Sequence, residues 1–131
     1  MTKTQEKEYE ALFNKAHLAG LHAGDSVAVA PMYVVEHTNP LDDNSPIKKV
    51  YPPVMDGVCG FAWVNVRPGT STFARWLRKT NKGRTDSYAG GVTIWVGHYN
   101  QSMTRKEAYA RAFAEVLRSA GITAYSNSRM D

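Results

Sequence analysis

The spacing of apolar residues along the chain predicts three amphipathic helices separated by β-rich segments. The first helix is expected over about residues 4 to 22. Its apolar positions recur every three or four residues: Tyr9, Leu12, Phe13, Ala16 and Ala19. Gly20 and Gly24 weaken the end of this helix, so Gly24-Asp25 predicts a stop followed by a turn.

The second helix is short and follows the turn "RPGTST". The hydroxyl of Thr70 or Ser71 can accept a hydrogen bond from the free N–H groups at the helix start. Phe73, Trp76 and Leu77 then form an apolar stripe at helical spacing. This pattern predicts a turn, a cap and a short helix that buries one face.

The third helix has the strongest pattern. Thr104 and Glu107 have the spacing of a capping box, and Gly121 supplies a C-terminal stop. Its apolar face is continuous over the whole segment: Tyr109, Ala112, Phe113, Val116, Leu117 and Ala120. We expect this helix to pack against a sheet.

Strand patterns occur in four segments. "SVAVAPMYVVE", residues 26–36, is β-rich, but Pro31 places it at a sheet edge or splits it. "GGVTIWVG" follows a glycine-rich turn, and "ITAYS" is a short final strand. The segment "FAWVNV" alternates and so has two faces: Phe61, Trp63 and Asn65 on one, and Ala62, Val64 and Val66 on the other.

These elements predict an α+β domain with a single mixed sheet of about four strands and about three helices, in the order α-β-β-α-β-α-β. Residues 37–53 contain four prolines and predict a long surface loop, which in a compact domain is usually functional or mobile. Residues 127–131 are polar and are expected to form a frayed tail, unless they dock on the domain.

Length and composition limit the possible classes of protein. The 131 residues suit one domain covering residues 1–131. No apolar run approaches the roughly 18 residues that a membrane helix needs, and the charged N-terminus lacks the apolar segment of a secretory signal. One cysteine cannot form an internal disulfide, which suits a reducing cytosol. The four histidines show no tight ligand spacing with Cys59, so no metal and no cofactor is expected.

The basic residues are unevenly distributed. Sixteen lysines and arginines against twelve acidic residues give a net charge of +4. Between Arg67 and Arg84 there is no acidic residue but six basic ones: Arg67, Arg75, Arg78, Lys79, Lys82 and Arg84. Together with Thr70, Ser71 and the helix N-terminus they predict an anion site, to which Tyr88 adds a ring for a base. The alternative is a solvated helix face. The glycine spacing does not match a P-loop, which argues against a nucleoside triphosphatase.

The segment "GHYNQSM", residues 97–103, joins a strand to the last helix. Loops in this position often carry ligand contacts, and four of its side chains can bind polar groups: His98, Tyr99, Asn100 and Gln101. The alternative is that these residues only shape the turn and cap the helix.

Cys59 lies between the glycines of "DGVCGFAWVNV". This stretch is loosely similar to the "DCSGFV" block of the NlpC/P60 cysteine peptidases, and "GGVTIWVG" is similar to their later histidine-bearing strand. The sequence departs from that family at two points, because the residues after Cys59 alternate as a strand and Val92 occupies the histidine position. A cysteine hydrolase is therefore the minor alternative, and the preferred interpretation is a small buried residue at a strand start.

Four segments resemble a family of small, mostly uncharacterised proteins of tailed bacteriophages: "DGVCGFAWV", "GGVTIWV", "QSMTRKEAYARAFAEVLRSAGI" and "AYSNSRMD". The resemblance implies a viral accessory protein in the host bacterial cytoplasm, and such proteins often disable host defences. We therefore expect a non-enzymatic protein that antagonises a host system by binding, as an anti-CRISPR-like inhibitor or by sequestering a phosphorylated or nucleotide ligand. Its partner would be a host protein or that phosphorylated small molecule. The alternative is a nucleic-acid-binding phage protein that uses the same residues.

Overall fold

The structure is a computed structural model and describes residues 1–27, 35–37, 47–50, 59–99 and 102–130. The elements follow in the order α1 (Lys3–Ser26), β1 (Val35–His37), β2 (Ile47–Val50), β3 (Gly60–Arg67), α2 (Thr72–Lys79), β4 (Arg84–Thr85), β5 (Val92–Trp95), α3 (Met103–Ser119) and β6 (Thr123–Met130). The predicted α+β class and the predicted order of the elements are confirmed, with the short strands β2 and β4 added.

Four strands form one sheet in the spatial order β4-β5-β3-β6. Every pairing within it is antiparallel, so the expectation of a mixed sheet was wrong in this detail. The physical reason is that β5 and β6, which run in the same direction and are connected through α3, are not neighbours in the sheet, because β3 lies between them and is antiparallel to both. β1 and β2 pair separately and antiparallel, with Glu36 opposite Lys49. β2 lies inside the segment predicted as a loop over residues 37–53; the rest of that segment, apart from His37, is outside the described residues.

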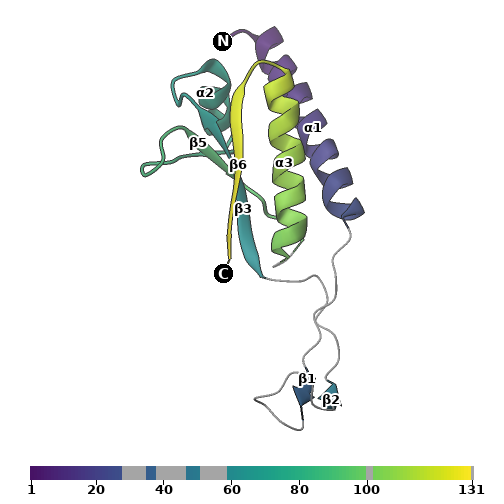
Figure 1. Cartoon of the computed structure of the whole chain (residues 1–131). Coiled ribbons are helices and arrows are strands. Elements are labelled where there is room, and N and C mark those ends of the chain that lie inside the picture. The colour runs from purple at the N-terminus through teal and green to yellow at the C-terminus, as the bar shows by residue number, and fades with distance from the viewer. Residues whose placement is uncertain (28–34, 38–46, 51–58, 100–101, 131) are drawn as a thin grey trace.

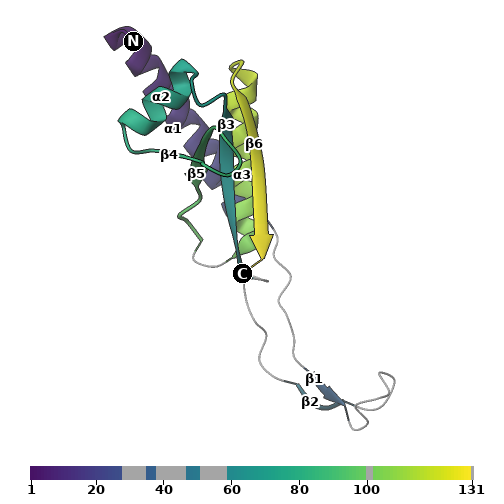
Figure 2. The same cartoon turned by 90° about the vertical axis from the view of Figure 1, so that its left-hand side faces the viewer.

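The helices α1 and α3 lie on one face of the four-stranded sheet, whereas none of the described helices lies in front of β3 and β6 on the other (Figures 1 and 2). The alternation of β3 explains this layering. The predicted division into two faces is confirmed: Ala62, Val64 and Val66 are buried beneath the helices, and Trp63 points to the opposite face. In Figure 1 the turn between β4 and β5 projects from that opposite side.

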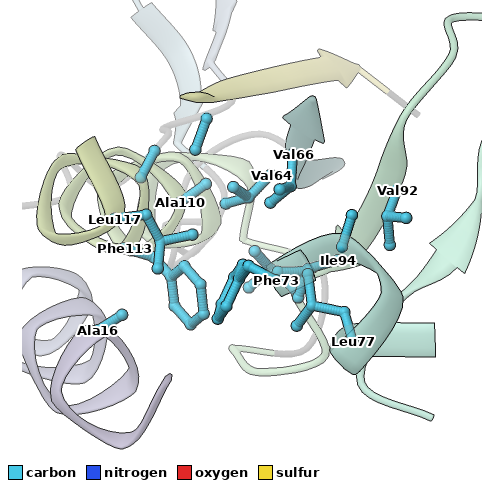
Figure 3. Close-up of a cluster of buried hydrophobic side chains, with 14 of the residues drawn as sticks. Ala16, Val64, Val66, Phe73, Leu77, Val92, Ile94, Ala110, Phe113 and Leu117 are labelled. Carbon is cyan, nitrogen blue, oxygen red and sulfur yellow. The ribbon is translucent and has the colours of Figure 1, made fainter. Parts of the chain in front are cut away.

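The core lies between the sheet and the three helices (Figure 3). α2 contributes Phe73 and Leu77, which lie over Val92 and Ile94 of β5. α3 contributes Phe113, whose ring meets Phe13 of α1 edge to face at 5.2 Å between centroids. Full burial of one such side chain stabilises a fold by about 1.5–3 kcal/mol, so this cluster fixes both helices on the sheet.

Helix α1 continues to Ser26, beyond the predicted stop. Gly20 and Gly24 are buried within it and face aromatic rings of the rest of the domain. A Cβ atom on Gly20 would lie 2.7 Å from the Tyr109 ring, and one on Gly24 would lie 2.5 Å from the Tyr99 ring. Both glycines therefore allow close packing inside the helix, and the prediction that they end it was wrong.

Helix α3 begins two residues before the predicted capping box, so the prediction that Thr104 caps it was wrong. Its N-cap is Ser102, whose hydroxyl accepts from the backbone N–H of Arg105 at 3.4 Å. Thr104 therefore lies within the first turn of the helix. At the other end Gly121 has φ of +84°, which confirms the predicted glycine stop.

The C-terminal residues 127–130 are ordered as strand, so the prediction of a frayed tail was wrong for them. β6 pairs with β3 over its whole length, from Thr123 opposite Arg67 to Met130 opposite Gly60. The backbone hydrogen bonds of this long ladder compensate the conformational entropy that a polar tail would otherwise retain.

Candidate functional site

The sheet face opposite the helices, called here the outer face, carries the odd-numbered residues of β3, β5 and β6 together with Arg84 of β4. Two tryptophans are its central feature. Trp63 and Trp95 are directly opposite in the ladder of β3 and β5, and their ring centroids are 5.0 Å apart at an interplanar angle of 47°. Trp95 remains 53% exposed, an unusual state for so large an apolar ring. The pair forms an aromatic platform on an uncovered sheet.

Three arginines share the outer face by strand register: Arg67, Arg84 and Arg129. The strands supply no carboxylate to this face. Asp86, in the turn after β4, is the one acidic residue among the described residues that line the cavity on this face. The outer face is therefore basic as well as aromatic.

A cavity of about 420 Å³ lies on the outer face. Residues of β3, β5, β6 and the β4–β5 turn line it, chiefly Trp63, Arg67, Tyr88, Trp95, Asn127 and Arg129. Its volume falls within the range of about 300–1,000 Å³ that is typical of small-ligand sites. Aromatic, cationic and amide groups thus converge on one hollow.

A hydrogen-bonded network orders one wall of the cavity. Asn65 is buried to 1% exposure, accepts from Arg67 Nε at 2.6 Å and donates through Nδ2 to the carbonyl of Gly90 at 2.8 Å. Asn65 Nδ2 also lies 3.5 Å from the hydroxyl of Thr93. Because Asn65 is held from two sides, it fixes the direction of the Arg67 guanidinium and anchors the β4–β5 turn.

Asp86 organises the same turn from its other end. Its carboxylate accepts from the backbone N–H groups of Ala89 at 2.8 Å and Tyr88 at 3.0 Å, and from the Thr93 hydroxyl at 3.0 Å. The Ala89 N–H, then the Thr93 hydroxyl and the Tyr88 N–H, hold the pKa of Asp86 below its ordinary value, and the charge of Arg67 adds to the effect. The carboxylate is therefore engaged by the turn and does not present a free negative charge to the cavity.

The structure brings together only part of the predicted anion site. Arg67 and Tyr88 line the cavity, and Arg84 lies on the same face. The other residues of the basic segment lie elsewhere: Thr70, Ser71, Arg75, Arg78, Lys79 and Lys82. Ser71 caps α2 by accepting from the N–H of Ala74 at 3.2 Å, as predicted.

The basic residues of α2 have structural partners or face solvent. Lys79 pairs with Glu6 of α1 at 2.5 Å, and Arg75 is exposed. Lys82 lies over the rings of Phe13 and Trp76, with its ammonium 5.6 and 5.4 Å from their centroids. These side chains therefore cover the helical layer and do not extend the outer face.

The predicted ligand loop after β5 divides into two parts. His98 and Tyr99 join an aromatic cluster with His17 and Tyr109 between α1 and α3. Tyr99 donates to the carbonyl of Leu21 at 3.1 Å. Asn100 and Gln101 lie outside the described residues. His98 and Tyr99 do not reach the tryptophan platform, and their contacts there are structural.

Cys59 is exposed, so the prediction of a buried thiol was wrong. It lies one residue before Gly60, which is the first residue of β3 and pairs with Met130 of β6, and it makes an isolated bridge with Ser102. Nothing on β6 therefore covers its side chain. Across the described ranges no group of three or more His, Cys, Asp or Glu side chains is placed to hold a metal.

Several residues of the cavity were not predicted as site residues: Trp63, Asn65, Asp86, Trp95, Asn127 and Arg129. The alternation of "FAWVNV" already placed Trp63 and Asn65 on a common face. The missing information was which face the helices cover, because both faces of that strand carry large apolar residues.

Comparison with known proteins gives no relative to guide the assignment: no family model, no curated protein and no solved structure matches the chain. In the parts of the chain that the structure describes, none of the helices is both long and apolar enough to cross a membrane. The functional argument therefore depends on the geometry of the outer face.

Proposed function

We propose that the protein binds single-stranded nucleic acid on the outer face. The observation that carries this proposal is the tilted Trp63–Trp95 pair, which lies on an open sheet with Trp95 half exposed and is bordered by Arg67 and Arg129. Proteins that bind single strands combine aromatic rings for base stacking with a cationic surface for the phosphates. Unpaired bases expose the π-faces that such rings need, whereas a duplex keeps its bases stacked on one another.

Charge favours a polyanionic ligand over an apolar one. The described strands bring three arginines to the outer face without a carboxylate beside them on that face, and the whole chain has a net charge of +4. An apolar peptide would leave these guanidinium groups desolvated and unpaired, which is costly. Phosphates would accept charge-assisted hydrogen bonds from them.

A direct test is fluorescence anisotropy with a labelled oligothymidylate of about 12 nucleotides, a length within the usual range of single-strand sites. We expect binding to the single strand, weaker binding to a duplex of equal length, and a decline of affinity with salt. If all three arginines contact phosphates, the logarithm of the association constant should fall with the logarithm of salt concentration with a slope of about −2. Absence of single-strand binding at low salt contradicts the proposal.

A matched pair of variants separates the outer face from general basicity. Arg129→Ala removes one cation from the outer face, and Arg75→Ala removes one from the exposed side of α2. Both change the net charge equally. The proposal requires that Arg129→Ala weakens binding clearly more than Arg75→Ala does.

The bacteriophage setting remains a prediction from sequence resemblance, as does antagonism of a host defence in the bacterial cytoplasm. Binding of unpaired nucleic acid is compatible with both, because a viral accessory protein could act on host or viral strands. A nucleotide signal is the second candidate ligand, favoured by the small volume of the cavity, about 420 Å³. Affinity capture from a bacterial host, followed by identification of bound nucleic acids, nucleotides and proteins, tests this wider role.

A further inference from the structure

We propose that the cavity of the outer face is a one-nucleotide site, in which Tyr88 and the tryptophan pair enclose a single base and Arg67 binds its phosphate. This inference rests on the proposed function and adds to it the size of the ligand unit and the separate roles of Tyr88 and Arg67 in binding it. The geometry points to a clamp built from two separate parts of the chain: the sheet, and the β4–β5 turn.

Tyr88 is the first observation. Its side chain is fully exposed, at 100%, although a tyrosine ring gains free energy by burial. The turn that carries it projects from the outer face, and Tyr88 lines the same cavity as Trp63 and Trp95 (Figure 1). A ring held in water beside the partly buried Trp63 and the half-exposed Trp95 is an incomplete stack that a planar ligand would complete.

The turn holds Tyr88 in place by specific bonds. Asp86 accepts from the N–H groups of Tyr88 and Ala89, and the carbonyl of Asp86 accepts from the N–H of Gly90 at 3.0 Å. Gly90 and Gly91 have φ of +81° and +71°, a region that favours glycine. The backbone that carries Tyr88 is thus ordered before any ligand arrives, which lowers the entropy lost on binding.

Arg67 determines the orientation of the nucleotide in the site. Asn65 takes only the Nε hydrogen of Arg67, at 2.6 Å, so the two terminal nitrogens of the guanidinium keep their donors for another acceptor. These donors match the bidentate geometry of a phosphate. The base and the phosphate of one nucleotide would therefore bind at the rings and at Arg67 respectively.

Size restricts the ligand to about one nucleotide. The cavity of about 420 Å³ has room for a base with its sugar and phosphate but not for several stacked bases. We therefore expect a free nucleoside monophosphate to compete with an oligonucleotide. The nucleoside alone and inorganic phosphate alone should compete much less, because each makes only half of the contacts.

The experiment uses the full chain, the labelled oligothymidylate and the variants Tyr88→Ala and Tyr88→Phe. Because one base–aromatic stack is worth about 1–3 kcal/mol, Tyr88→Ala should weaken oligonucleotide binding by roughly 5- to 150-fold, and Tyr88→Phe should retain it. Since the Tyr88 side chain is fully exposed, both variants should unfold at the temperature of the parent protein. Thymidine monophosphate, thymidine and inorganic phosphate are then compared as competitors.

Two results overturn the clamp while leaving the proposed function intact. One is that Tyr88→Ala binds the oligonucleotide as tightly as the parent protein does. The other is that thymidine or phosphate alone competes as well as thymidine monophosphate. By contrast, failure of the parent protein to bind the oligonucleotide at low salt contradicts the proposed function itself, and the clamp with it.

Discussion

Asn65 and Arg67, two residues apart on β3, form a hydrogen bond of 2.6 Å that joins the buried middle of the sheet to its exposed cationic edge. Asn65 simultaneously donates to the carbonyl of Gly90, so one buried amide connects the strand, the arginine and the β4–β5 turn. Removal of this amide is expected to affect both stability and binding.

Asn65→Ala should lower the free energy of unfolding by about 1–3 kcal/mol, because the buried amide loses its hydrogen bonds to the Gly90 carbonyl and from Arg67 Nε, each worth about 0.5–1.5 kcal/mol. It should also weaken oligonucleotide binding, because Arg67 loses its orientation. Urea unfolding and fluorescence anisotropy measure the two effects. Asn127→Ala, an exposed amide on the same face, is the control and should change stability by less than about 0.5 kcal/mol.

Trp95→Ala should weaken single-strand binding by roughly 5- to 150-fold, the equivalent of about 1–3 kcal/mol for one lost stack. Trp95→Phe keeps an aromatic face and should lose less. Because Trp95 is half exposed, neither variant should unfold the domain. Equal affinities for the alanine variant and the parent protein would show that the tryptophan platform does not contact bases.

Gly20→Ala should destabilise the protein, although alanine is the better helix former. The new Cβ would approach the Tyr109 ring to 2.7 Å, and such overpacking costs about 1–3 kcal/mol against a propensity gain of about 1 kcal/mol. Thermal unfolding measures the net change. In the background Tyr109→Leu the same substitution should become neutral or stabilising, and a loss that persists there would argue against the ring contact as its cause.

Stability should fall as the pH drops below about 6.5, the ordinary histidine value. Burial lowers the pKa of His17, and the nearby His98 lowers it further. The unfolded chain therefore takes up a proton before the folded protein does, so acid favours unfolding through this group. Protonated His17 also loses the ability to accept from the Tyr109 hydroxyl, 2.5 Å from its Nδ1.

The variant His17→Gln tests this assignment by thermal unfolding between pH 5 and pH 8. Its unfolding temperature should depend less on pH than that of the parent protein. His22→Gln, at an exposed position five residues later, should leave the dependence unchanged. If both variants behave alike, the acid sensitivity arises elsewhere.

Cys59 should react with a thiol reagent in the folded protein, because its side chain is exposed. We expect the one thiol of the chain to be modified without denaturant, and Cys59→Ser to change the free energy of unfolding by less than about 0.5 kcal/mol. A thiol that reacts only after unfolding would restore the interpretation of a buried cysteine.

The sequence predicted the helices and strands better than the contacts between residues that are far apart in the chain. Periodicity identified all three helices, the two faces of β3 and the cap at Ser71, because these depend on nearby residues. The prediction that Gly20 and Gly24 end the first helix was wrong. The sequence alone does not distinguish a glycine that ends a helix from a glycine that makes room for an aromatic ring. The contact that decides between them is to Tyr109 or Tyr99, far along the sequence.

The candidate site was only partly predictable for the same reason. Arg67, Arg84 and Tyr88 stood out because they belong to a basic run and its flanking turn. Their partners Trp95 and Arg129 come from other strands, and strand order and register bring them together. Conversely, Lys79 and Lys82 are close to Arg67 in sequence, but α2 directs them to Glu6 and to the helical layer.

The dual role of β3 limits how this protein can change. Ala62, Val64 and Val66 fill the core, whereas Trp63, Asn65 and Arg67 form the outer face, so no position in this stretch is neutral. Insertion or deletion of one residue there would turn every following side chain to the other side of the sheet. Arginine and asparagine would enter the core while valines faced the ligand, so folding and binding would fail together, and the two sets of residues must evolve at a fixed spacing.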